Sequence, residues 1–140
     1  MVNITSYRRE CKECHRLYTN EHEEWCKPCQ ISKLEKNFIK WTSGNEKIDK
    51  LIQKIQLKVE NSQDIVFEWI PYDQFCDYKK LVNYGLAELY SATWKNGPLI
   101  YKINKKKYVR SQNKVAVLKC LNRSQNTTNE FLDKVYNFLF

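Results

Sequence analysis

Four of the six cysteines form two C-x2-C pairs near the N-terminus, Cys11–Cys14 and Cys26–Cys29. Each pair predicts a tight turn whose two thiolates converge, and two such turns give a tetrahedral sulfur cage suited to Zn²⁺. So short a segment has little apolar core, so a bound metal would supply most of its folding free energy. The spacing therefore predicts a structural Zn²⁺ site held by Cys11, Cys14, Cys26 and Cys29.

Disulfide bonds and a redox-active dithiol are the alternative interpretations of these four cysteines. The N-terminus lacks the apolar core of a signal peptide, and no apolar run has membrane-spanning length. We therefore expect an intracellular, cytoplasmic location without a membrane partner, where disulfides are rare. The Cys26-Lys-Pro-Cys29 pair resembles a thioredoxin-type dithiol, but that motif needs a βαβ context that this segment is too short to hold. Cys76 and Cys120 lie in apolar surroundings and are expected to be buried thiols.

Residues 31–63 carry helical periodicity in two runs that are separated near Gly44. The first run is Ile31, Leu34, Phe38 and Trp41, and the second is Ile48, Leu51, Ile52, Ile55 and Val59. Ser43-x-x-Glu46 has the pattern of a capping box at the start of the second helix. The segment is therefore predicted to be an amphipathic helical hairpin that links the zinc-binding segment, residues 1–30, to the remaining chain.

From residue 64 onward the pattern changes to short strands. Ile65, Phe67 and Trp69 alternate, and further strands are predicted at 78–84, 86–94, 99–103, 108–110 and 115–121. Asn96-Gly97 favours a tight hairpin. Thr127-x-x-Glu130 predicts the start of a final helix. Antiparallel strands followed by one helix predict an α+β domain over residues 64–140.

One lysine, Lys119, stands inside the apolar run 115–121. A run that is apolar on both strand faces is normally covered on both sides. A buried ammonium then needs a partner, usually a carboxylate or a phosphate. We therefore expect Lys119 to be buried beside an anionic group, and we take it as a candidate nucleotide-binding residue.

A hairpin over residues 80–94 followed by a strand that carries a lysine resembles the N-terminal lobe of a protein kinase, in which a glycine-rich loop covers the ATP phosphates. More narrowly, the chain resembles a lineage-expanded group of fungal protein-kinase-like proteins. That group carries a C-x-x-C segment, a Trp-Thr-Ser-Gly-Asn linker and a Glu-Trp-Ile-x-Tyr-Asp-x-Phe motif before the kinase domain. The linker motif is residues 41–45 here, and the second motif is residues 68–75. The resemblance covers nearly the whole chain.

The resemblance implies an ATP site on these strands. Lys119 matches the lysine that holds the phosphates, and Val117 matches the small residue that packs on adenine. Leu89 takes the place of the valine that covers the adenine. The glutamate that partners the lysine in the family falls on Lys134, so the expected replacement is Glu130 on the same helical face or the neighbouring Asp133.

The phosphate loop departs from the family pattern. Its three glycines fall on Val82, Tyr84 and Ala87, and only the family's extra glycine, Gly85, remains. Side chains at the glycine positions obstruct the approach of phosphates to the backbone, so ATP binding is expected to be weak or absent. The chain also lacks the H-R-D-x-x-x-x-N and D-F-G motifs, so the implied catalytic base and magnesium ligands are missing.

Two functions are therefore compatible with the sequence. The first is a kinase-like chain that is truncated within the N-lobe and catalytically inactive, with a kinase or signalling component as its protein partner. The alternative is a zinc-stabilised module that binds protein or nucleic acid and no nucleotide. Nucleic acid is the weaker expectation because residues 1–30 carry five basic and five acidic side chains, although the whole chain has a net charge of +8. An unrelated enzyme is disfavoured because no Ser-His-Asp set or carboxylate cage is evident.

Overall fold

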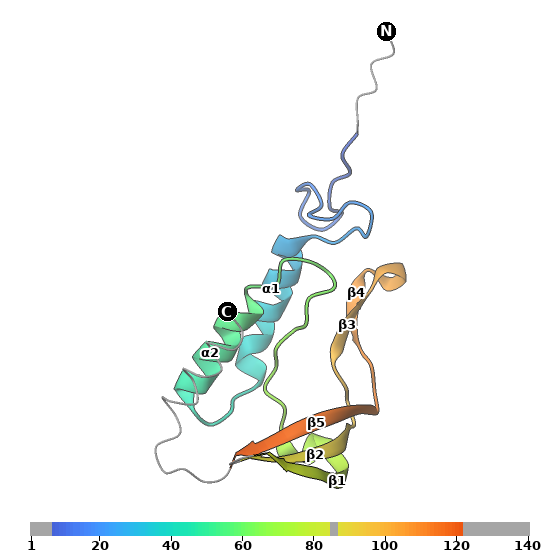
Figure 1. Ribbon diagram of the computed structural model, residues 1–140. Helices are drawn as coiled ribbons and strands as arrows, with labels where there is room; N and C mark the ends of the chain where they lie inside the picture. Colours follow the sequence, from blue (N-terminus) through green and yellow to red (C-terminus); the bar gives the residue numbers. More distant parts are fainter. Residues whose placement is uncertain (1–6, 85–86, 122–140) are drawn as a thin grey trace. The chain divides into compact units, whose positions relative to one another are not determined.

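The computed structural model describes residues 7–84 and 87–121 (Figure 1). It groups the chain into two units, which are described separately below. Unit 1 comprises Met1–Trp69 and Leu99–Val109, and unit 2 comprises Ile70–Pro98 and Arg110–Phe140. The grouping differs from the predicted segments 1–30, 31–63 and 64–140, because the first two share one unit and a β-hairpin from the third joins them. Helices and antiparallel sheets are both present, so the predicted α+β class is confirmed.

Two antiparallel helices lie side by side in unit 1 (Figure 1). Helix α1 spans Lys27–Asn37 and continues into a 3-10 turn, η1, at Phe38–Lys40, and helix α2 spans Glu46–Gln56. Helix α1 therefore starts four residues earlier than the apolar periodicity predicts, with a proline in its first turn where no intrahelical N–H donor is needed. Within the described part of the chain, no helix has the length and apolar character needed to cross a bilayer.

The loop between the helices forms a network around Asp49. Its carboxylate accepts hydrogen bonds from the Thr42 hydroxyl (2.6 Å) and from the backbone amide of Ser43 (2.8 Å). The cap of α2 is Asn45, whose side chain accepts from the amides of Lys47 and Ile48 at 3.0 and 3.3 Å. The predicted capping role of Ser43 is therefore wrong, because its hydroxyl donates to Asp49 and leaves the helix amides to Asn45.

The core of unit 1 combines side chains from four separate parts of the sequence. Its buried members are Trp25, Leu34, Val59, Val66 and Tyr101, and Ile31, Phe38, Leu99 and Tyr108 pack against them. The segment around Val66 forms no strand, so the predicted strand at residues 65–69 is wrong. A hydrogen bond from helix α2 satisfies one backbone carbonyl of this irregular segment. The side chain of the buried Gln56 donates to the carbonyl of Phe67 at 2.6 Å.

A two-stranded sheet completes unit 1. Strand β3 spans Leu99–Lys102 and strand β4 spans Lys107–Arg110, joined by the 3-10 turn η3 at Ile103–Lys105. Tyr101 and Tyr108 meet edge to face across the pair, with ring centroids 5.4 Å apart. This contact places one buried aromatic ring of the hairpin against the helical core.

Unit 2 contains a three-stranded antiparallel sheet in the order β1-β2-β5. Strand β1 spans Phe75–Tyr84 after a short 3-10 turn, η2, at Tyr72–Gln74; strand β2 spans Ala87–Trp94 and strand β5 spans Lys114–Leu121. The ladder between β2 and β5 runs without interruption from Ala87–Leu121 to Trp94–Lys114. The strand runs predicted from the sequence therefore match the observed strands to within a few residues.

The predicted tight hairpin at Asn96-Gly97 is wrong. Strand β2 pairs with β1 and β5, and β3 pairs with β4, so this turn does not join two paired strands. Gly97 has a positive φ of 67° as predicted, but it lies where residues 95–98 cross residues 110–113. The predicted final helix, including Glu130 and Lys134, lies outside the described residues, as does Gly85.

Candidate metal centre

The four cysteine sulfur atoms converge in unit 1. The Sγ atoms of Cys11, Cys14, Cys26 and Cys29 all lie within 4.8 Å of one another. The Cys11–Cys29 and Cys14–Cys26 sulfur pairs are 3.7 and 3.5 Å apart. Four sulfurs placed about 2.3 Å from a central ion at the corners of a tetrahedron are separated by roughly 3.8 Å. The predicted convergence of the two pairs is confirmed, and the cluster is compatible with a structural metal.

The first cysteine pair lies in a tight turn that is closed by backbone hydrogen bonds. The amide of Cys11 donates to the carbonyl of Arg16 at 2.7 Å, and the amide of His15 donates to the carbonyl of Cys11 at 2.8 Å. His15 adopts a left-handed backbone conformation, with φ at 59°, which reverses the chain. These bonds hold the Cys11 and Cys14 side chains on one side of the turn. His15 and His22 are exposed and outside the cluster, as expected for surface residues.

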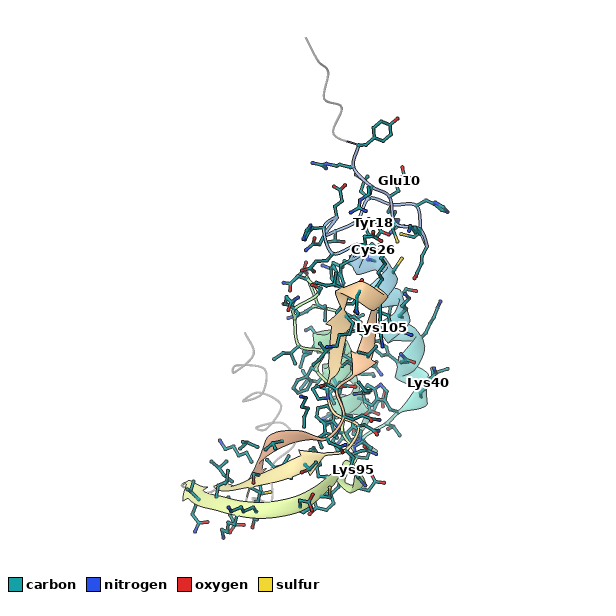
Figure 2. The ribbon with its side chains drawn as sticks, turned by 90° about the vertical axis from the view of Figure 1, so that its right-hand side faces the viewer. Glu10, Tyr18, Cys26, Lys40, Lys95 and Lys105 are labelled. Atoms are coloured by element: carbon teal, nitrogen blue, oxygen red, sulfur yellow. The ribbon has the colours of Figure 1, made fainter. Side chains whose placement is uncertain are left out.

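The second pair is positioned by the start of α1. Cys26 is the N-cap of the helix, and Cys29 lies in its first turn. Figure 2 shows Cys26 at this helix end, below the loop that carries Tyr18. The Thr19 hydroxyl accepts from the amide of Lys27 at 2.8 Å, which fixes the entry of the chain into the helix. The helix N-terminus presents positive backbone dipoles to both thiolates, which offsets part of the cost of burying their charge.

The pKa values of three thiols are shifted, one downward and two upward. The backbone amide of Arg16 lowers the pKa of Cys14 to about 7. Burial raises the pKa of Cys26 and of Cys29. Four thiolates packed this closely need a cation to be charged together, and a divalent metal supplies it while the four protons leave. Four cysteine ligands fill a tetrahedral shell, so the chemistry of this donor set is structural and leaves no open position for a substrate.

Charged residues tie the cysteine segment to the rest of unit 1. Glu24 forms ion pairs with Arg9, at 3.1 Å, and with Lys106 of the β3–β4 hairpin. The Lys106 ammonium lowers the pKa of Glu24. The Tyr101 hydroxyl also donates to the backbone carbonyl of Glu24, at 3.4 Å. No sequence pattern predicts this anchor, because Glu24 and Lys106 are far apart along the chain and neither belongs to a motif.

A hollow of about 360 Å³ opens beside the sulfur cluster. Cys14 and Cys29 line it together with Arg16, Lys33 and Lys36. Lys33 forms an ion pair with Glu13 at 2.8 Å. Three basic side chains and one carboxylate thus line the hollow beside the two cysteines.

The residues predicted to form an ATP site lie on the sheet of unit 2. Val82 on β1 pairs with Leu89 on β2, and Leu89 pairs with Lys119 on β5, so the three side chains form one row across the sheet. Val117 is two residues from Lys119 on the same strand and therefore shares its face. The structure thus brings four of the five predicted residues together, while the fifth, Gly85, lies outside the described residues.

The expected burial of β5 is wrong. Val115 and Val117 are 77% and 65% exposed, and Lys119 and Cys120 are exposed as well. Within residues 7–84 and 87–121, β5 is an edge strand of its sheet, and Lys119 makes no ion pair there. Among the described strands, the apolar run therefore lies at the edge of the sheet and not in its interior. The predicted burial of Cys76 is met only in part, since this residue is half-buried.

Comparison with protein-family models, curated proteins and solved structures finds no match for this chain. The resemblance to kinase-like proteins stays a prediction that rests on the sequence motifs alone.

Proposed function

We propose that this protein is a zinc-stabilised protein-binding module whose metal has a structural role. The observation that carries the proposal is the convergence of four cysteine sulfurs within 4.8 Å of one another. A set of four thiolates is typical of structural Zn²⁺ sites, and it provides neither a bound water nor a free coordination position for catalysis.

We favour a zinc site over disulfide bonds and over a redox-active dithiol. All four cysteines are free, so the sulfurs are not paired as disulfides. The second C-x2-C pair opens helix α1 after an irregular loop, which is not the strand–helix context of a thioredoxin-type dithiol. The remaining interpretation, a tetrahedral metal site, accounts for all four sulfur atoms together.

The local charge of the cysteine segment favours a protein partner over nucleic acid. A Zn²⁺ ion with four thiolates adds a local charge of −2 to a segment whose side chains are balanced in charge. Ile39 and Ile65 of unit 1 are 92% and 87% exposed. We take these two exposed side chains as candidate contacts of the partner and test them by substitution below.

Binding measurements on the zinc-loaded full chain test the proposal. Fluorescence anisotropy with labelled single-stranded RNA and double-stranded DNA is expected to show no saturable binding at physiological salt. The immobilised chain is expected to retain a protein partner from an extract of its source, and to lose it after chelation of the metal or in an Ile39→Glu/Ile65→Glu variant. Nucleic-acid binding that weakens steeply with salt would contradict the proposal, as would capture that is unaffected by chelation.

A second candidate function is weak nucleotide binding without phosphotransfer. The row formed by Val82, Leu89 and Lys119 supports it, because the same three positions contact ATP in the family that the sequence resembles. Titration with a fluorescent ATP analogue is expected to show weak binding that a Lys119→Ala variant abolishes. Equal binding by the wild type and this variant would remove Lys119 from the site. Metal-dependent phosphate transfer by the wild type would contradict an inactive chain.

A further inference from the structure

The two outer strands of the sheet in unit 2 differ in how they can meet another strand. Strand β1 has register shifts between Cys76 and Lys79 and between Lys80 and Val82. Asp77 within it has a positive φ of 54°. Bulges, kinks and lysines on an edge strand prevent pairing with a further strand. The β1 edge is therefore protected.

Strand β5 lacks the bulges and the kink of β1, although it carries two lysines, Lys114 and Lys119. Its pairing with β2 shows no register shift along the whole strand, and none of its residues has a positive φ. Among residues 7–84 and 87–121, no strand pairs with its outer edge. The run from Val115 to Leu121 has no proline or glycine and carries a single charge. A regular, apolar edge of this kind presents unpaired N–H and C=O groups as a template for a further strand.

We infer that the outer edge of β5 is an interface between two copies of this chain. The two β5 strands pair in antiparallel fashion about a two-fold axis at Val117, which extends the three-stranded sheet across both copies. Because the interface is isologous, each copy donates and accepts the same set of backbone hydrogen bonds. The inference rests on unit 2 and is independent of the metal centre and of its proposed function.

The positions of the two lysines of β5 favour this register. With Val117 opposite its copy, Lys119 faces the copy's Val115 and Lys114 faces the copy's Cys120. The two Lys119 side chains are then four residues apart, about 14 Å along the strands, which exceeds the distance over which physiological salt screens exposed charges. A shift of one residue that opposes Lys114 to Lys119 would place like charges side by side and reverse the faces of the sheet.

Burial at the exposed valines supplies the apolar part of the interaction. Val115 and Val117 lie on one face of β5 and are the most exposed valines among the exposed large hydrophobic residues of unit 2. The proposed register places Val117 directly against its copy and Val115 against the aliphatic stem of Lys119. Cross-strand contacts between β-branched side chains stabilise antiparallel pairs.

Sedimentation velocity of the metal-loaded full chain over a wide range of concentrations tests the inference. We expect a reversible monomer–dimer equilibrium. A Val117→Lys substitution opposes two lysines at the two-fold axis and is expected to weaken dimerisation by about tenfold or more. Val82→Lys is the matched control, since Val82 is a 51% exposed valine on the protected edge strand of the same sheet, and it should leave the dimer constant unchanged.

Hydrogen exchange on the wild-type chain gives a second readout that needs no folded variant. Amides of β5 are expected to exchange more slowly as the concentration rises, while those of β1 are unaffected. A chain that stays monomeric at every concentration overturns the inference, including the case in which β5 amides are protected at all concentrations by a segment of the same chain. Equal weakening by Val82→Lys and Val117→Lys also overturns it.

Discussion

Replacement of Gly97 by alanine is expected to destabilise unit 2 strongly. Gly97 has a φ of 67°, and a Cβ atom added to it would lie 1.7 Å from the carbonyl oxygen of Ser111. Two backbone hydrogen bonds hold the crossing at this point. The amide of Ser111 donates to the carbonyl of Pro98, and the amide of Asn113 donates to the carbonyl of Lys95, both at 3.0 Å. An alanine side chain therefore cannot be accommodated unless the two segments separate.

The expected cost follows from these contacts. The left-handed conformation costs alanine about 1–2 kcal/mol relative to glycine. Restoring an ordinary carbon–oxygen separation requires a shift of roughly 1.5 Å, which breaks both hydrogen bonds at about 0.5–1.5 kcal/mol each. The Gly97→Ala variant should thus lose about 2–5 kcal/mol of the free energy of unfolding. Gly44→Ala is the matched control, since Gly44 has a φ of 82° and nothing within 4 Å of the added Cβ. It should lose about 1–2 kcal/mol, the backbone cost alone.

Urea unfolding measures the free energy of unfolding that each variant loses, and hydrogen exchange locates the destabilised region. Exchange in Gly97→Ala should accelerate in β2 and β5, which flank the crossing, whereas Gly44→Ala should affect the loop before α2. Equal losses in the two variants would refute the reasoning, because they would show that the segments do not approach each other closely at Gly97.

Two further predictions concern unit 1. Trp25 is fully buried, so Trp25→Ala should lower the free energy of unfolding by about 3–5 kcal/mol in urea titrations, and an equal loss in the control Trp69→Ala, at the 38% exposed tryptophan, would contradict this. Hydrogen bonds from Ser43 and Thr42 hold the pKa of Asp49 below its ordinary value of 3.8. The Asp49 carboxylate therefore stabilises the fold above pH 3.8, and this contribution disappears as the pH falls through the pKa of Asp49 in the folded protein. Asp49→Asn should therefore be less stable than the wild type at neutral pH and lose less stability on acidification below pH 4; parallel pH profiles of the two proteins would contradict this.

The parts of the structure that follow from local sequence were predictable. The two C-x2-C pairs converge because each is a short turn whose geometry depends on its own residues. The strands from β1 to β5 were found because alternation and turn residues act over a few positions. Helix α2 was placed correctly to within one turn, but its cap depends on which of several polar side chains binds Asp49, and a sequence pattern does not decide this.

Long-range partners account for the rest. Within unit 1, the β3–β4 hairpin packs on the core through Tyr101 and is anchored by the ion pair between Lys106 and Glu24. Neither contact can be predicted from sequence periodicity. The apolar run of β5 suggested an interior strand with a buried Lys119, yet the run alone does not distinguish an interior strand from an edge strand. The strand order and the exposure of Val117 in the structure show that β5 is an edge strand among the described strands.

Metal analysis of the purified full chain is the most direct test of the metal centre on which the proposed function depends. Native mass spectrometry combined with elemental analysis should find one zinc ion per chain. Cys26→Ser, at a buried member of the sulfur cluster, should lose the ion together with the protection of unit 1 amides against hydrogen exchange, whereas Cys120→Ser, at an exposed cysteine outside the cluster, should retain both. A metal-free wild type with the same protected amides, or a Cys26→Ser variant that keeps its zinc and its protection, would contradict a structural zinc site.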